Sequence, residues 1–176
     1  MKISLCILLA VNNVFFPDKP VNHHQPNKEW VCQPCGQDCD KEVYDKPGTC
    51  PVCFMPLVKK TTVVFKNISP EQIAGYIRQH AGVVLIDVRT KEEFEGKANP
   101  DFGTLRNAIN VPVQQLESRL PSLEGLKKKD ILVYCSHGHR SEVASYILTQ
   151  HGFDHVTNMT GGMHVMHGRS IMVNAK

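Results

Sequence analysis

From Thr61 onward, short apolar segments alternate with segments that carry the start signals of helices. Residues 83–88 and 131–134 are apolar runs interrupted only by Asp87, which is typical of strands buried on both faces. Two Ser/Thr-x-x-Glu/Gln patterns, at Ser69 and Thr90, predict capping boxes and therefore helix starts. Strands that alternate with helices in this way predict an α/β domain with a parallel sheet and helices on both faces.

The expected strands are residues 61–65, 83–88, 108–111, 131–134 and 156–159, and the expected helices follow Ser69 and Thr90, cover 113–120 and 141–151, and follow Gly161-Gly162. In a parallel sheet of this kind, ligands bind at the carboxyl ends of the strands. The residue that follows 131–134 is Cys135, so it is expected at such an end.

The 176 residues leave room for a small unit beside one ordinary domain. Five of the seven cysteines fall within residues 29–60, which we call the Cys-rich module. Residues 61–176 are the expected α/β domain. Residues 1–28 are expected to be a leader and a linker, because an apolar run follows Lys2 and a stretch rich in Asn, Pro and His comes after it.

The apolar run at residues 3–11 is similar to the centre of a short secretory leader, although no small-x-small cleavage site follows it. It is too short to span a bilayer, so stable membrane insertion is not expected. These features slightly favour an exported, periplasmic location over a cytoplasmic one. The net charge of +3 comes without a basic stripe interleaved with aromatic residues, so a nucleic-acid partner is not expected.

Cys135 begins the segment Cys-Ser-His-Gly-His-Arg-Ser, residues 135–141, between a strand and a helix. That placement turns backbone N–H groups toward the sulfur and adds the positive end of the helix dipole, and both effects stabilise a thiolate. Gly138 permits a tight loop, and the forked donors of Arg140 suit an oxyanion. The pattern indicates a reactive cysteine and not a core cysteine, whereas His137 and His139 are weaker candidates for a direct role.

Four segments, in the same order, resemble those of single-domain rhodaneses. The loop at 135–141 is similar to the family's Cys-x-x-Gly-x-Arg-Ser loop, and residues 87–89 (Asp-Val-Arg) with 93–94 (Glu-Phe) are similar to its Asp-Val-Arg and Glu-Phe segment. Residues 107–112 (Asn-Ala-Ile-Asn-Val-Pro) and 161–162 (Gly-Gly) match two further segments. The resemblance covers about residues 63–168.

The resemblance implies a rhodanese-like five-stranded parallel sheet and a ping-pong sulfurtransferase. A thiolate takes sulfane sulfur from thiosulfate, a persulfide or a polysulfide and passes it to a thiol or cyanide-like acceptor, with a protein acceptor as a further option. The transfer itself needs no cofactor. By the resemblance, Cys135 is the nucleophile that carries the persulfide. The substrate-binding residues that it implies are Ser136, His137, Gly138, His139, Arg140 and Ser141.

Two other functions stay open. One is a non-catalytic rhodanese-like binding or metal-sensing module, against which the presence of both Cys135 and Arg140 argues. The other is a cysteine phosphatase or arsenate reductase. Cysteine phosphatases place five residues between Cys and Arg to wrap a phosphate, whereas four residues separate Cys135 from Arg140. The shorter loop favours a guest of the size of a sulfur atom.

The Cys-rich module contains two Cys-x-x-Cys knuckles, a spacing that suits a closed tetrahedral zinc site. The predicted ligands of zinc, or of another soft metal, are Cys32, Cys35, Cys50 and Cys53, and Cys39 is a fifth thiol that could replace one of them. The alternative is a loop held by disulfides, which gains weight if the protein is exported.

Residues 47–58 also resemble a small heavy-metal-binding module of bacterial metal-efflux proteins, with Phe54 in place of the usual Gly. This resemblance leaves open whether the metal is structural, sensed or carried.

Overall fold

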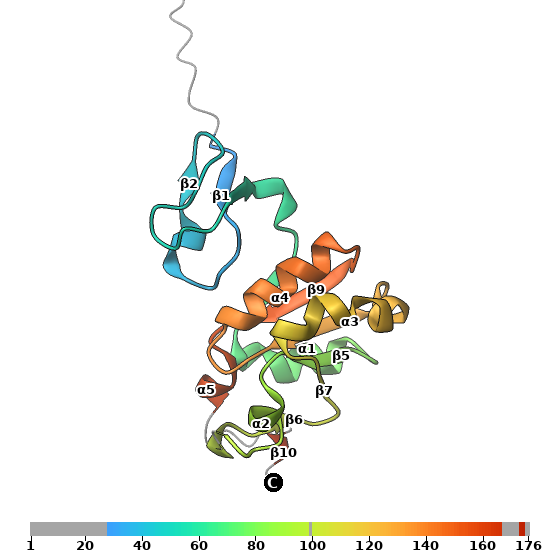
Figure 1. The fold of residues 1–176 in the computed structure, drawn as a ribbon. Helices are drawn as coiled ribbons and strands as arrows, with labels where there is room; N and C mark the ends of the chain where they lie inside the picture. The colour runs from blue at the N-terminus through green and yellow to red at the C-terminus, as the bar shows by residue number, and fades with distance from the viewer. Residues whose placement is uncertain (1–27, 99, 167–172, 175–176) are drawn as a thin grey trace, which may run out of the picture.

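The computed structural model describes residues 28–98, 100–166 and 173–174. The leader and nearly all of the linker expected at residues 1–28 therefore lie outside the described residues. Figure 1 shows the Cys-rich module at one end of the molecule and the α/β domain at the other, joined by the segment between β3 (Leu57–Lys59) and β4 (Lys66–Ile68). Within the described ranges, no helix has the length and apolar character needed to cross a membrane.

The α/β domain is built on a five-stranded sheet, and all four strand pairs in it are parallel. Its order is β4, β9 (His155–Met159), β8 (Asp130–Tyr134), β5 (Val84–Asp87) and β7 (Ile109–Asn110). The predicted fold class is confirmed. β8 is the central strand, and Cys135 follows its last residue, at the carboxyl edge of the sheet where ligands bind in such folds.

Apolar side chains of β8 are buried on both faces of the sheet. Ile131 and Val133 belong to one core cluster together with residues of α3 and α4. Leu132 and Tyr134 point the other way, as the two-residue period of a strand requires, and belong to a second cluster with residues of α1 and α5. Helices therefore cover both faces, as Figure 1 shows around β9 and β5.

The helices are α1 (Ile73–Gln79), α2 (Lys91–Phe94), α3 (Leu116–Leu123), α4 (His139–Gln150) and α5 (Gly162–Met166). Short 3-10 turns are η2 (Lys60–Thr62), η3 (Pro70–Gln72), η4 (Pro100–Phe102), η5 (Val113–Gln115) and η6 (Glu124–Leu126). A small antiparallel pair joins β6 (Thr104–Leu105) to β10 (Val173–Asn174).

Both predicted capping boxes are present. The backbone N–H of Ser69 donates to Gln72 Oε1 at 2.8 Å, and η3 then leads into α1. At α2, the N–H of Thr90 donates to Glu93 Oε2 at 3.0 Å, and the N–H of Glu93 donates to Thr90 Oγ1 at 3.3 Å. The second box fixes the Glu93 carboxylate just after the carboxyl end of β5.

The strand expected over residues 61–65 is wrong. The structure has the 3-10 turn η2 there, closed by a hydrogen bond from Thr62 Oγ1 to the carbonyl of Lys59. The edge strand is β4, which begins only at Lys66, where the chain comes into register with Thr157 of β9. Pairing with a neighbouring strand sets this boundary, and the β-branched run does not.

The Cys-rich module has a three-stranded antiparallel sheet in the order β2 (Val43–Tyr44), β1 (Trp30–Cys32) and β3. Its small core consists mainly of buried cysteines with Leu57. Since so little apolar side chain is buried, this unit is of the size at which natural folds rely on disulfides or a metal. All six cysteines among the described residues are free thiols.

The module touches the α/β domain at the start of α4. Gly36 has a φ of 77°, and a Cβ placed on it would lie 2.4 Å from the Cα of His139. Backbone therefore packs on backbone there, which a residue with a side chain would prevent. His139 directly follows residues 135–138, which we call the cysteine loop, so the Cys-rich module lies beside this loop.

Candidate active site

Cys135 lies at the bottom of the loop between β8 and α4, and the residue is only 1% exposed. Its sulfur accepts a hydrogen bond from the backbone N–H of Gly138, with N and Sγ 3.1 Å apart. Gly138 precedes α4 and has a φ of 100°, a conformation that residues with a side chain rarely adopt. The turn at Gly138 thus folds the backbone over the sulfur, as the sequence predicts.

The same loop is held from outside by the N-terminal end of α5. The N–H of Met163 donates to the carbonyl of Cys135, and the N–H of His164 donates to the carbonyl of Ser136, both at 2.8 Å. In a trans peptide the C=O and N–H point in opposite directions, so the N–H groups of Ser136 and His137 are directed away from α5. This orientation is what a loop that cradles an anion requires.

Gly162 makes this contact possible. Its φ is 63°, and a Cβ built on it would lie 2.5 Å from the carbonyl oxygen of Cys135 and 2.6 Å from the nitrogen of His137. Gly138 is similarly close to Gly161, with 2.9 Å between its ideal Cβ and the Gly161 nitrogen. The double glycine is therefore needed for backbone segments to lie against the cysteine loop.

α4 begins at His139, two residues earlier than the expected Ser141. His139 and Arg140 consequently belong to the first turn of the helix and not to the loop. Ser141 is buried, and its hydroxyl donates to the carbonyl of Gly138 at 2.9 Å, which secures the turn. The six predicted substrate-binding residues are contiguous in space, but their roles differ.

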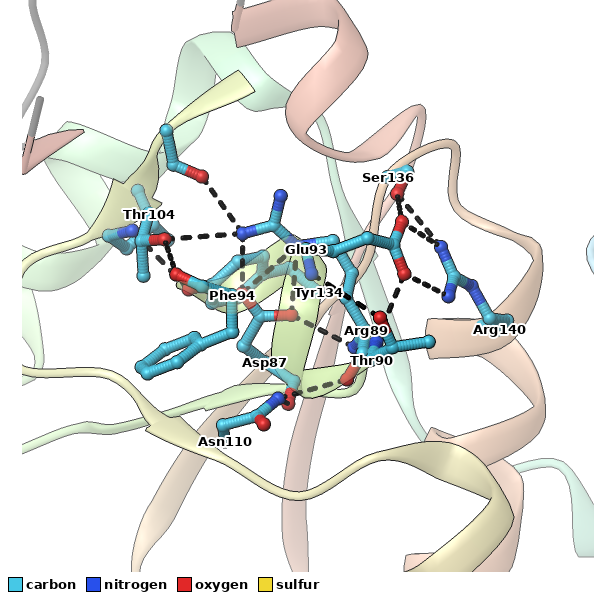
Figure 2. A network of polar contacts seen from close by, with 12 residues as sticks. Asp87, Arg89, Thr90, Glu93, Phe94, Thr104, Asn110, Tyr134, Ser136 and Arg140 are labelled. Carbon is cyan, nitrogen blue, oxygen red and sulfur yellow. Dashed lines mark hydrogen bonds and ion pairs between the residues drawn. The ribbon is translucent and has the colours of Figure 1, made fainter. Parts of the chain in front are cut away.

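Arg140 is bound by an acidic side chain from another element. Its Nη1 and Nη2 donate to Glu93 Oε2 and Oε1 at 2.7 and 2.8 Å, and Nη2 also donates to Ser136 Oγ at 2.8 Å. The Ser136 hydroxyl in turn donates to Glu93 Oε1 at 2.7 Å. Figure 2 shows the three side chains forming one closed network beside the cysteine loop.

The Glu93 carboxylate is strongly stabilised in its charged form. The hydrogen bonds from Arg140, followed by those from Ser136 and the Thr90 backbone, lower the pKa of Glu93 to about 2. The side chain of Glu93 is 10% exposed and that of Arg140 30%. The sequence places Glu93 in a capping box and in a segment similar to that of rhodaneses, but neither feature predicts its contact with Arg140, so Glu93 was missed as a residue of the site.

Asp87 and Arg89 form a second, fully buried ion pair, as Figure 2 shows. The carboxylate of Asp87 accepts from the N–H, Nε and Nη2 of Arg89 at 2.7 to 3.0 Å. Arg89 Nη2 also donates to the carbonyl of Gly103, and the side chain of Asn110 donates to the carbonyls of Asp87 and Arg89. The pair and its hydrogen bonds tie the segment after β5 to Gly103 and to β7.

Two exposed imidazoles lie beside the loop. His137 and His164 stack with ring centroids 5.0 Å apart, and the ring of Phe102 meets each of them edge-on at 5.8 Å. His137 therefore points to α5 and η4, whereas the hydrogen bond to the Cys135 sulfur comes from Gly138. Its place is at the rim of the site.

In the Cys-rich module, the Sγ atoms of Cys32, Cys39, Cys50 and Cys53 all lie within 4.8 Å of one another. Four thiolates at about 2.3 Å from a tetrahedral zinc ion would be about 3.8 Å apart. Cys32 Sγ and Cys53 Sγ are 3.2 Å apart, and three of the four residues are buried. Both the spacing and the donor atoms fit a closed thiolate site for a soft metal ion.

Cys35 does not belong to this group of four. Its Sγ donates to Asp40 Oδ1 at 3.2 Å, and Asp40 Oδ2 accepts from the N–H groups of Cys35 and Gly36 at 2.8 and 2.7 Å. A second, overlapping set contains Cys32, Cys35, Cys39 and Asp40. The structure thus brings three of the four predicted ligands together with Cys39, and places Cys35 on the side of Asp40.

Comparison with known proteins matches residues 69–168, more than half of the chain, to the Rhodanese-like domain family. A sulfurtransferase of Allochromatium vinosum is 29% identical over 97 residues, which cover 55% of this chain and 83% of that protein. A tRNA uridine(34) hydroxylase of Pectobacterium atrosepticum is 33% identical over 84 residues, 46% of this chain and 22% of that protein. The chain thus spans less than a quarter of this longer relative.

Among solved structures, the crystal structure of a rhodanese-related protein from Thermoplasma volcanium is similar with a TM-score of 0.52 and 26% identity. The similarity covers 64% of this chain and all of that one. The family match over residues 69–168 agrees with the order of the strands and with the strand, loop and helix around Cys135. This chain belongs to the family of proteins with a Rhodanese-like domain.

Proposed function

We propose that this chain is a sulfurtransferase that carries sulfane sulfur as a persulfide on Cys135. The observation that carries the proposal is the loop geometry: the Gly138 N–H donates to the Cys135 sulfur, and the carbonyls of Cys135 and Ser136 are turned outward to α5. An anion attached to this sulfur meets N–H groups and the positive end of α4. The sulfurtransferase among the relatives supports the same chemistry.

The transfer has two balanced steps. The Cys135 thiolate attacks the sulfane sulfur of thiosulfate, the S–S bond of thiosulfate breaks, and sulfite leaves with the electron pair, so that Cys135 holds S–S⁻. An acceptor such as cyanide then attacks the outer sulfur, which gives thiocyanate and restores the thiolate. A thiol acceptor takes the same sulfur and becomes a persulfide.

The test is the intact mass of the protein after incubation with thiosulfate or polysulfide, before and after addition of cyanide. We expect a gain of one sulfur atom on the peptide that contains Cys135, removed by cyanide, and no such gain on that peptide in Cys135→Ser. If neither donor loads Cys135, the proposal fails, and the non-catalytic binding module becomes the better account.

We further propose that the Cys-rich module holds zinc or another soft metal through Cys32, Cys39, Cys50 and Cys53. Bound there, the ion would cross-link β1, the 3-10 turn η1 (Asp38–Lys41) and the second knuckle, and supply the stability that a small core lacks. The mutual distances of the four sulfurs and their burial support this ligand set over one that contains Cys35.

Two matched variants test the ligand set. Metal bound per chain after purification, measured by mass spectrometry, should fall strongly in Cys39→Ser and stay near the wild-type value in Cys35→Ser. The reverse result, with metal lost from Cys35→Ser and kept in Cys39→Ser, would restore the ligand set predicted from the two knuckles. If no metal were bound to the wild-type protein or to either variant, the proposed metal site would be refuted.

A further inference from the structure

The chemistry of the cysteine loop depends on how much positive charge it offers to a sulfur donor. Arg140, in the first turn of α4, carries a positive charge beside the cysteine loop, and the family resemblance implies that it contacts an anionic substrate. In the structure, three of its N–H···O bonds are already made within the protein, two to Glu93 and one to Ser136. The guanidinium is thus engaged before any donor arrives.

The Glu93–Arg140 pair carries no net charge. The Glu93 carboxylate is held ionised by Arg140, Ser136 and the Thr90 N–H, with a pKa of about 2. A doubly charged donor that approaches Arg140 therefore also approaches the carboxylate that is hydrogen-bonded to it. Breaking the pair to free Arg140 would leave a largely buried carboxylate without its partner, which is costly.

The cleft beside the loop adds further negative charge. A cleft of about 390 Å³ lies between the Cys-rich module and the loop, and Gly138, whose N–H holds the Cys135 sulfur, is part of its wall. Its lining includes the acidic residues Asp38, Asp40 and Glu142. Lys41 also lines it and is paired with Asp38, so these two charges cancel and the negative charge of the lining comes from Asp40 and Glu142.

From these two observations we infer that Glu93 is a positioning residue that sets donor specificity. By neutralising Arg140, it makes the site selective for singly charged or neutral sulfane donors, such as thiosulfonates and organic persulfides, over the thiosulfate dianion. The inference rests on the proposed sulfur transfer through Cys135, and it narrows the class of donor. Transfer from a thiosulfonate, R–SO₂–S⁻, moves the terminal sulfur to the Cys135 thiolate and releases the sulfinate R–SO₂⁻.

The probes are thiosulfate and methanethiosulfonate, which differ by one charged oxygen replaced by a methyl group. For each, kcat/KM with cyanide as acceptor is divided by the rate constant of its uncatalysed reaction with a small thiol. We expect the wild-type protein to favour methanethiosulfonate after this correction. A corrected preference for thiosulfate would overturn the inference even if no variant were stable.

The decisive variant is Glu93→Gln, which retains an acceptor for the Thr90 N–H but removes the charge that holds Arg140. It should raise the thiosulfate to methanethiosulfonate ratio by about tenfold or more, the size of one charge-assisted hydrogen bond, chiefly through a lower KM for thiosulfate. Glu92→Gln makes the same change of charge one residue away, on an exposed side chain, and should leave the ratio unchanged.

A third variant tests whether the gain in the ratio depends on the Arg140 guanidinium. In Glu93→Gln/Arg140→Gln, the ratio should return to the wild-type value. An unchanged ratio in Glu93→Gln, with Cys135 still loaded by both donors, would refute the role of Glu93 and leave the proposed function intact. If neither donor loads Cys135 in the wild-type protein, sulfur transfer itself is refuted, together with this inference.

Discussion

The buried pair of Asp87 and Arg89 allows a sharp test of what holds the α/β domain together. Both side chains are 0% exposed, and the Asp87 carboxylate accepts hydrogen bonds from three separate groups of Arg89. Replacing Asp87 by Asn retains an acceptor of the same shape but leaves a permanent guanidinium charge buried beside only neutral acceptors. Loss of one partner of such a pair costs about 3–5 kcal/mol. We therefore expect Asp87→Asn to destabilise the domain by about that amount.

The matched control is Asp154→Asn, which removes an aspartate paired with Lys128 at the surface. These side chains are 44% and 82% exposed, so the same chemical change should cost less than about 1 kcal/mol. Urea unfolding followed by far-UV circular dichroism measures both variants, because all five α-helices of the described residues lie in the α/β domain.

Fluorescence of Trp30, the only tryptophan of the chain, follows the Cys-rich module separately. In Asp87→Asn, the urea midpoint followed by Trp30 fluorescence should shift less than the midpoint followed by far-UV circular dichroism. If Asp87→Asn cost no more free energy of unfolding than Asp154→Asn, the reasoning that a buried, many-bonded ion pair fixes the segments after β5 would be wrong.

Two further predictions concern the loop and its network. Gly162→Ala and Gly152→Ala both place a side chain at positive φ, a strain of about 1–2 kcal/mol. Only at Gly162 would the new Cβ also meet backbone atoms of the cysteine loop. Only Gly162→Ala should therefore abolish loading of Cys135 in the mass assay. The ion pair of Glu93 should give an acid-dependent stability. Because its pKa falls from 4.5 in the unfolded chain to about 2, the stabilisation is complete above pH about 4.5 and is lost as the pH falls toward 2. Over this window, the free energy of unfolding of the wild type should thus fall by up to about 3 kcal/mol more than that of Glu93→Gln. Urea unfolding at a series of pH values measures both. Equal losses in the two proteins would contradict the lowered pKa of Glu93.

Most of the fold could be predicted because local signals and burial agree in this sequence. The apolar run before Cys135 is the central strand, and the capping boxes at Ser69 and Thr90 both form. The failure at residues 61–65 has a physical cause. An edge strand is defined by its pairing, and β4 takes its register from β9, about ninety residues away in the chain.

The candidate site was predictable where one segment carries it. Cys135, Gly138 and Ser141 are placed by a contiguous loop, so the pattern of that loop suffices. The partnership of Glu93 with Arg140 depends instead on β5 and β8 being neighbours in the sheet, an order that alternation of strands and helices does not fix. The grouping of Cys39, and not Cys35, with Cys32, Cys50 and Cys53 likewise depends on the path of the chain after Cys35, which the knuckle spacing alone does not specify.

Because Gly36 packs against the start of α4, the Cys-rich module and the cysteine loop line the same cleft. An acceptor that reaches Cys135 by way of the adjoining cleft passes between the Cys-rich module on one wall and His137 and Gly138 on the other. A small thiol can enter such a cleft, whereas a protein acceptor must be complementary in shape to both the Cys-rich module and the cysteine loop. A molecule that contacts Gly138 in this cleft therefore contacts the Cys-rich module as well.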